Sequence, residues 1–116
     1  MTECRCTKQS LEENEKLWHK MFDEKGFKEG QALLRFRGNM QSGNTTMRDP
    51  ALFRINTKRH ARQEQKYKVW PTYDFAGIIF DSISKVSHAM RSKEFELRKE
   101  LHHTILDKLG MEKAEF

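Results

Sequence analysis

Long apolar runs are missing from this sequence, and none approaches the ~18 consecutive apolar residues that a membrane-spanning helix needs. The first residues, M-T-E-C-R-C-T-K, also lack the apolar centre of a signal peptide. These two absences predict a cytoplasmic protein with no membrane partner. Apolar residues make up 36% of the 116 positions and charged residues 34%, so we expect one domain, or a piece of a larger one, with a thin core or a missing partner surface.

Nucleotide-binding fingerprints are also absent, since the chain has neither G-x-G-x-x-G nor a P-loop. No Ser-His-Asp or Cys-His grouping can be argued from spacing. The only cysteines are Cys4 and Cys6. Two thiolates this close can reach one tetrahedral ion, which predicts half of a zinc site, with His19 the nearest further ligand. A structural zinc site needs four ligands, so two reduced, exposed thiols are an equally good interpretation.

Positive charge is in excess, with 22 Lys and Arg against 17 Asp and Glu. This favours a polyanionic partner, although a solvated basic surface without a partner fits as well. Cations gather in two stretches. One is the alternating segment 31–37, where Arg35 and Arg37 share the face opposite Leu34 and Phe36. The other is the connector 56–66, which is either a solvated loop or a phosphate-facing loop and includes Lys58, Arg59 and Arg62.

Local patterns predict the first elements. Ser10 and Glu13 fit a capping box, which predicts a helix from Ser10 with Gly26 as its stop. Alternation predicts strands over 31–37, 52–55 and 67–70. From Thr72, a possible N-cap, the period becomes helical and apolar residues recur at helical spacing: Phe75, Ile78, Ile79 and Ile83.

The C-terminal part continues this order. Residues 86–91 alternate like a short strand, and residues 94–109 carry one apolar stripe that predicts a helix stopped by Gly110. Residues 67–110 therefore predict a β-α-β-α unit of a parallel, doubly wound sheet, which is an α/β fold. We expect the adjacent His102 and His103 to be solvated, because neighbours on a helix point about 100° apart.

Several segments together resemble class I glutamyl-tRNA synthetases of the archaeal and eukaryotic type, whose close relatives are the glutaminyl-tRNA synthetases. The most specific are M-R-D-P at 47–50 and P-T-Y-D-F-A at 71–76. The similarity extends over about residues 4–110. Its other segments are L-F-R-I at 52–55, Y-K-V-W at 67–70, D-S-I at 81–83 and S-H-A-M-R at 87–91.

The resemblance implies a fold and a site. Residues 1–69 would be part of the inserted α+β domain that binds the tRNA acceptor stem, and residues 70–116 the start of the second half of the Rossmann-like catalytic domain. Tyr73 would contact the glutamate substrate. Arg91 would select glutamate, since glutamine enzymes carry a small uncharged residue there and a fixed cationic fork suits a carboxylate. Arg35, Arg37, Lys58, Arg59 and Arg62 would face tRNA.

The resemblance also implies ATP with Mg²⁺, glutamate and tRNA(Glu) as partners, and an upstream Cys pair that would complete a zinc site with Cys4 and Cys6. The family's H-I-G-H and K-M-S-K-S-like motifs are absent from this sequence. The favoured hypothesis is an internal piece of a glutamate–tRNA ligase, inactive by itself. The alternatives are a stand-alone RNA-binding or regulatory module and a zinc-dependent scaffold.

Overall fold

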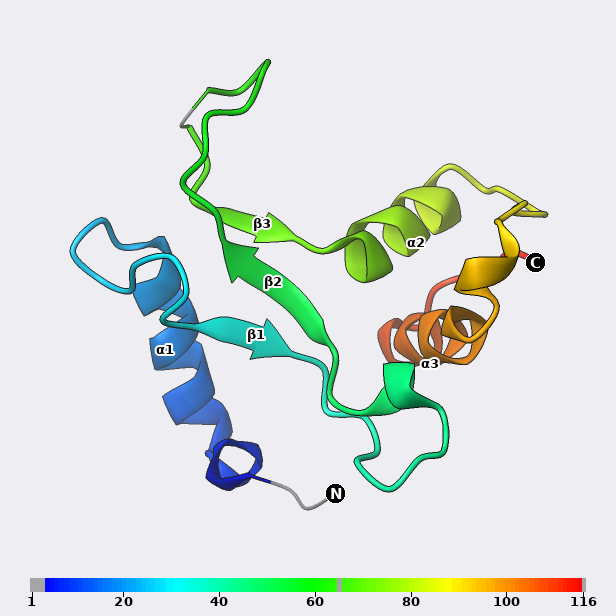
Figure 1. The fold of residues 1–116 in the computed structure, drawn as a ribbon, viewed down its shortest axis with the longest axis horizontal. Helices are drawn as coiled ribbons and strands as arrows, with labels where there is room; N and C mark the ends of the chain where they lie inside the picture. Colours follow the sequence, from blue (N-terminus) through cyan, green and yellow to red (C-terminus); the bar gives the residue numbers. More distant parts are fainter. Residues whose placement is uncertain (1–3, 65, 116) are drawn as a thin grey trace.

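A computed structural model describes residues 4–64 and 66–115 of the chain. A three-stranded antiparallel sheet lies at its centre in the order β1-β2-β3. Helix α1 covers one side of the sheet. Helices α2 and α3 pack together near the N-terminal end of β2 (Figure 1). The elements are α1 (Leu11–Phe22), β1 (Leu33–Arg35), β2 (Ala51–Ile55), β3 (Val69–Pro71), α2 (Tyr73–Ile83) and α3 (Arg98–Leu109), with short 3-10 turns η1 (Arg5–Lys8), η2 (Thr45–Met47) and η3 (Lys93–Phe95).

Helix α1 begins where the capping pattern predicts. The Ser10 hydroxyl accepts a hydrogen bond from the backbone N–H of Glu13 at 3.1 Å, which satisfies one of the unpaired donors of the first turn. The helix ends at Phe22, before Gly26. Its inner face places Trp18 and Met21 against the sheet residues Ile55 and Val69. The predicted helix is therefore confirmed with a shorter C-terminal end.

Three of the predicted strands form: β1 and β3 are shorter than expected, whereas β2 is one residue longer. The register pairs Leu34 with Phe53 and Arg54 with Trp70, so β2 is the central strand. Phe53 of β2 packs against two hydrophobic clusters. One includes Met21 of α1, and the other includes Ile78 of α2 and Leu101 of α3. The predicted mixture of helices and strands is confirmed.

The predicted strand over 86–91 is wrong. The segment pairs through one parallel bridge, between His88 and Glu115, and no named strand of the described residues includes it. Alternation is a property of the segment alone, whereas a strand requires a neighbouring strand to pair with. The parallel β-α-β-α unit predicted over 67–110 is consequently not formed by the described residues, whose sheet is antiparallel.

Helix α3 carries the largest part of the core. Leu101 and Ile105 are almost fully buried and pack with Ile78 of α2 and with Met47 and Leu52 from the first half of the chain. The helix begins at Arg98, later than the predicted residue 94, and ends at Leu109, with Gly110 as the predicted stop in the left-handed conformation, with φ of 67°. No helix within 4–64 and 66–115 is long and apolar enough to span a bilayer.

Candidate functional site

Tyr73 is the first residue of α2, and the start of this helix is attached to the sheet. The backbone N–H of Thr72 donates to the Leu52 carbonyl at 2.7 Å, and the Thr72 hydroxyl donates to the Ala51 carbonyl at 2.9 Å. Thr72 thus occupies the predicted N-cap position, but its side chain bonds to β2 and makes no cap hydrogen bond. The Tyr73 ring is half exposed beside Phe95, with ring centroids 5.4 Å apart.

Arg91 lies next to Tyr73, although eighteen residues separate them in the sequence. Its guanidinium carbon lies 5.8 Å from the centroid of the Tyr73 ring, within reach of a cation–π interaction. The predicted position of Arg91 at the end of a strand is wrong, because the residue lies in the extended segment between α2 and η3. The structure therefore brings together the two residues predicted to bind glutamate, although Arg91 lies in a connecting segment and not at the end of a strand.

Asp81 orients the Arg91 side chain. Nη2 of Arg91 donates to Oδ2 of Asp81 at 2.7 Å, and both side chains are largely buried, at 17% and 23% exposure. The fixed guanidinium can offer planar, charged donors to a carboxylate beside the Tyr73 ring. No role was predicted for Asp81 from the sequence. Its signal was spacing, since it follows Tyr73 by about two helical turns.

A second cluster of polar and charged side chains lies close to Tyr73. Oδ1 of Asp74 lies 2.9 Å from Nε2 of His102, and Oδ2 accepts from Arg98. The hydrogen bond from His102, followed by that from Arg98, holds the pKa of the Asp74 carboxyl below its usual range. His102 is completely buried at the α2–α3 interface, and its ring lies 6.5 Å from that of Tyr73.

The expectation that His102 and His103 are solvated is wrong. His102 faces Asp74, and His103 is half buried with Nε2 3.1 Å from the carbonyl oxygen of Ala114. Both environments come from segments distant in sequence: the first turn of α2 and the C-terminal tail. No pattern within α3 could have revealed either one.

Cys4 and Cys6 are free and exposed. Backbone N–H groups of Cys6 and Thr7 donate toward the Cys4 sulfur and lower the pKa of its thiol, which favours the thiolate form. Among residues 4–64 and 66–115, however, no group of three or more His, Cys, Asp or Glu side chains could hold a metal ion. His19 therefore does not complete a set with the two thiols, and this part of the chain does not fit a zinc ion by itself.

The five cations predicted to face tRNA lie in two groups. Arg35 is at the end of β1 that pairs with Ala51, and its Nη1 donates to the carbonyl oxygen of Asp49 at 2.8 Å. Arg37 follows it, exposed. Lys58, Arg59 and Arg62 lie beyond the opposite end of β2, in the long connection to β3 that projects at the top of Figure 1.

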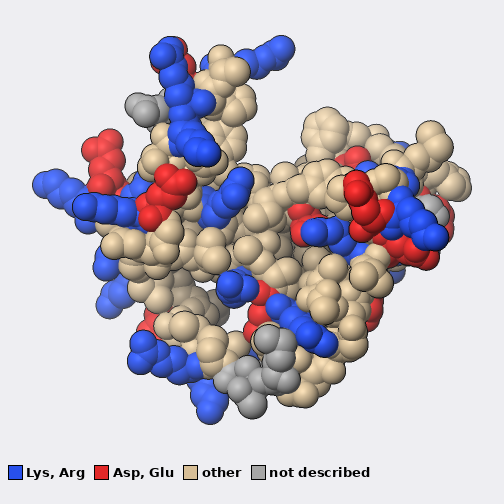
Figure 2. All heavy atoms as spheres, viewed as in Figure 1, with Lys and Arg blue, Asp and Glu red and all other residues tan. Residues whose placement is uncertain are grey.

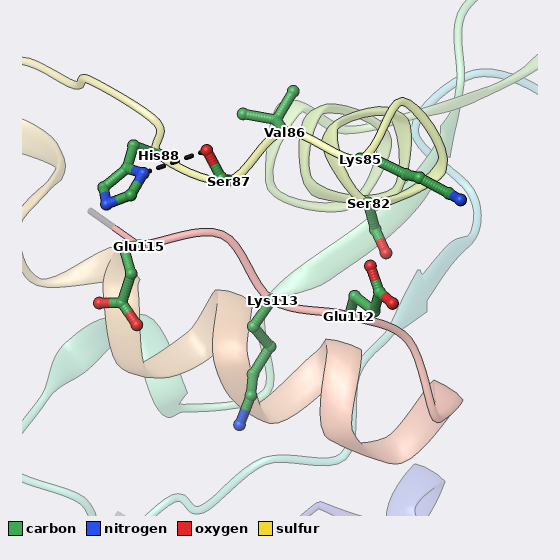
Figure 3. A pocket seen from close by; sticks show the side chains of 8 residues that line it. All are labelled: Ser82, Lys85, Val86, Ser87, His88, Glu112, Lys113 and Glu115. Carbon is green, nitrogen blue, oxygen red and sulfur yellow. Dashed lines mark hydrogen bonds between the residues drawn. The ribbon is translucent and has the colours of Figure 1, made fainter.

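Two of the cavities formed by the described residues lie elsewhere. One of about 500 Å³ lies between the end of α2 and the C-terminal tail, where His88 and Ser87 are within hydrogen-bond distance and Lys85 points away from the other lining side chains (Figure 3). The other, of about 580 Å³, lies between α1 and β1 and is lined by Cys4, Cys6, Arg35 and Arg37 among others. Neither cavity includes Tyr73 or Arg91.

Comparison with known proteins gives a consistent family. The model of the family described as tRNA synthetases class I (E and Q), catalytic domain, matches residues 1–116. A glutamate–tRNA ligase of Cenarchaeum symbiosum is 52% identical over 96% of this chain and 19% of its own length. One of Nitrosopumilus maritimus is 55% identical over 86% of this chain and 17% of its length.

A glutamine–tRNA ligase of Buchnera aphidicola is also similar, with 45% identity over 84% of this chain and 17% of its own length. The chain thus spans about a fifth of the length of the curated relatives it matches.

Proposed function

Because the chain belongs to the family of class I tRNA synthetases for glutamate and glutamine, and matches their catalytic domain, we propose that it is part of a glutamate–tRNA ligase. Such an enzyme uses ATP with Mg²⁺ to attach glutamate to tRNA(Glu). The chain's contribution would be the glutamate pocket and contacts to the acceptor end of the tRNA. The similarity to glutamate–tRNA ligases over nearly the whole chain supports this choice.

The observation that carries the proposal is the placement of Arg91 beside Tyr73. A guanidinium oriented by Asp81 at 2.7 Å presents a planar set of charged donors. A side-chain carboxylate can accept two of these hydrogen bonds, whereas a neutral amide supplies one oxygen and turns its own donors toward the cation. The half-exposed Tyr73 ring would form one wall of the pocket and its hydroxyl would reach a polar group of the substrate.

The division into 1–69 and 70–116 remains part of the proposal. One core cluster, with Met21, Ile55 and Val69, supports a unit formed by α1 and the sheet. The other cluster crosses the proposed boundary, since Met47 and Leu52 pack with residues of α2 and α3. The first segment would therefore be the acceptor-binding insertion, attached to the catalytic part through the start of β2.

We assign no role in the ATP-dependent step to the residues named above. The sequence contains neither H-I-G-H nor a K-M-S-K-S-like motif. What the described residues offer is positioning of glutamate by charge and shape, and positioning contributes strongly to such transfers.

Arg91 provides the test. In a glutamate–tRNA ligase that contains this chain, Arg91→Ala should raise the KM for glutamate about a hundredfold, because a charge-assisted, bidentate contact is worth roughly 2–3 kcal/mol. The KM for ATP should stay within about twofold. Arg91→Lys should keep part of the charge effect but lose the fork geometry.

The matched control is Lys99→Ala, which removes an exposed cation of α3 and should leave both constants unchanged. Steady-state kinetics of aminoacylation with glutamate and ATP varied separately give the answer. A glutamate KM that is unchanged in Arg91→Ala would remove the assignment of the pocket.

A further inference from the structure

The connection between β2 and β3, described over residues 56–64 and 66–68, forms an arm that projects away from the sheet (Figure 1). At its base the backbone N–H of Asn56 donates to the carbonyl of Lys68 at 2.9 Å. Further out, His60 and Glu64 exchange two backbone hydrogen bonds of 2.8 Å each. The two sides of the arm are thus joined by backbone hydrogen bonds at its base and again further out.

Three aromatic rings gather along this arm. The His60 ring stacks on Trp70 of β3 with centroids 5.2 Å apart and an interplanar angle of 17°. The Tyr67 ring meets Trp70 edge-on at 5.8 Å, and the Trp70 indole N–H donates to the Tyr67 carbonyl at 3.0 Å. His60 is exposed although one of its faces covers Trp70, so the opposite face is open to a further flat group.

Backbone groups hold the His60 ring in this orientation. Its Nδ1 accepts from the N–H groups of Arg62 and Gln63, at 3.1 Å each. Nδ1 is therefore the unprotonated nitrogen and Nε2 carries the hydrogen. A ring that is already oriented loses little conformational entropy when a ligand stacks on it.

The arm is also strongly cationic. Residues 56–68 contain one acid, Glu64, and five cations: Lys58, Arg59, Arg62, Lys66 and Lys68. Figure 2 shows Lys and Arg side chains at the tip and along one side of the projecting part. Arg59 is paired with Glu64 at 2.7 Å, and Lys68 donates to the Asp23 carbonyl at 2.7 Å. Lys58 and Arg62, both exposed, remain close to His60 in sequence and suit phosphate groups.

We infer that the arm is a stacking platform for an unpaired RNA base, with the outer face of His60 extending the His60–Trp70 stack and Lys58 and Arg62 contacting adjacent phosphates. This rests on the proposed function and specifies how RNA is contacted. Bases inside a duplex are already stacked on their neighbours, whereas a terminal or single-stranded base offers a free face to an aromatic ring. The ligand is therefore a terminal or single-stranded base of an RNA.

The experiment compares two fluorescent RNA hairpins with the same stem, one blunt and one with a single-stranded extension, binding to the 116-residue chain at low salt. His60→Ala should weaken binding of the extended hairpin at least about fivefold, because base–aromatic stacking is lost. Binding of the blunt hairpin should change by less than about twofold. His60→Phe, which keeps a flat ring, should retain most of the preference.

Two further variants separate stacking from charge. His19→Ala, an exposed histidine of α1, is the matched control and should change nothing. The combination Lys58→Ala with Arg62→Ala should weaken both hairpins and reduce the salt dependence. Thermal unfolding of each variant checks that the arm variants remain folded.

The outcomes distinguish this inference from the proposed function. Salt-dependent binding of both hairpins that His60→Ala does not change, or weakens equally for both, overturns the stacking platform and leaves the proposed function in place. No binding of either hairpin by the unaltered chain overturns the platform together with the proposed RNA contacts. The glutamate kinetics of Arg91 variants then decide the rest of the proposed function independently.

Discussion

Two acidic side chains of α2 each bind an arginine from a later segment of the chain. Asp81 holds Arg91 beside Tyr73, and Asp74 accepts from Arg98 and faces the buried His102. Partial burial strengthens such charge-assisted hydrogen bonds relative to surface pairs. The position of the Tyr73–Arg91 pair therefore depends on carboxylates that would contact no substrate.

Asp74 makes the stability of the chain depend on pH. Because its folded pKa lies below the unfolded value, its contribution is fully present above the unfolded pKa, near 4, and is lost as pH falls through the folded pKa. Asp74→Asn should lower the free energy of unfolding at neutral pH by about 2 kcal/mol and flatten the decrease below pH ~4. Urea unfolding at several pH values measures both.

Asp107→Asn is the matched control for this prediction. Asp107 pairs with Lys113 at 2.9 Å on the surface, with 61% of its side chain exposed. Surface pairs contribute little, so this variant should resemble the unaltered chain at every pH. An equal acid sensitivity of Asp74→Asn and the unaltered chain would contradict the role of Asp74.

At the scale of elements, the M-R-D-P segment acts as a turn that attaches the loop 38–44 to the start of β2. Asp49 has a positive φ of 44°, which aspartate tolerates better than most residues. Its Oδ1 accepts from the N–H of Gly38 at 2.9 Å. Met47 beside it is buried in the core with α2 and α3. One of the two segments most specific to the family thus has a structural role here.

At Gly38 this turn leaves no room for a side chain. A Cβ at Gly38 would lie 2.1 Å from the carbonyl oxygen of Met47, so the backbone would have to move. Gly38→Ala should lower the free energy of unfolding by about 2–3 kcal/mol. Gly43→Ala in the same loop, where a Cβ meets nothing within 4 Å, should change it by less than ~0.5 kcal/mol. Chemical denaturation of both variants makes the comparison, and equal stabilities would argue against the close approach.

Across the whole molecule, two core clusters share one side chain, Phe53 of β2. Its ring lies 5.1 Å from Trp18 of α1 and 5.0 Å from Phe75 of α2. Such tilted and edge-on aromatic pairs contribute beyond the area that they bury. Phe53 therefore couples the α1 side of the sheet to the α2–α3 side, on either side of the boundary proposed near residue 69.

Removal of this ring should uncouple the two sides. Phe53→Ala should lower stability by about 3 kcal/mol and separate two transitions that coincide in the unaltered chain. Tryptophan fluorescence follows Trp18 and Trp70, and circular dichroism follows the helices. Phe80→Ala, which removes a ring of α2 that is 69% exposed, should preserve a single transition. Coincident transitions in Phe53→Ala would show that other contacts couple the clusters.

The candidate site was predictable from the sequence to a limited extent. Tyr73 and Arg91 were named through a family resemblance, and the structure places them side by side. Their role in binding glutamate stays a prediction. Asp74 and His102 carried no local signal because 28 residues separate them. The stacking of His60 on Trp70 was equally invisible, since the alternation of 67–70 says nothing about which ring covers the strand.

The sequence by itself determined the features that depend on neighbours within a few residues: the capped start of α1, the left-handed stop of α3 at Gly110, and the three strands. Capping and side-chain periodicity are local interactions, so local patterns reveal them. Only the tertiary structure decided that residues 86–91 pair through a single bridge to Glu115, outside every named strand of the described residues, and that His102 is buried against Asp74. Strand pairing and burial depend on residues far away in the chain, which no local pattern contains.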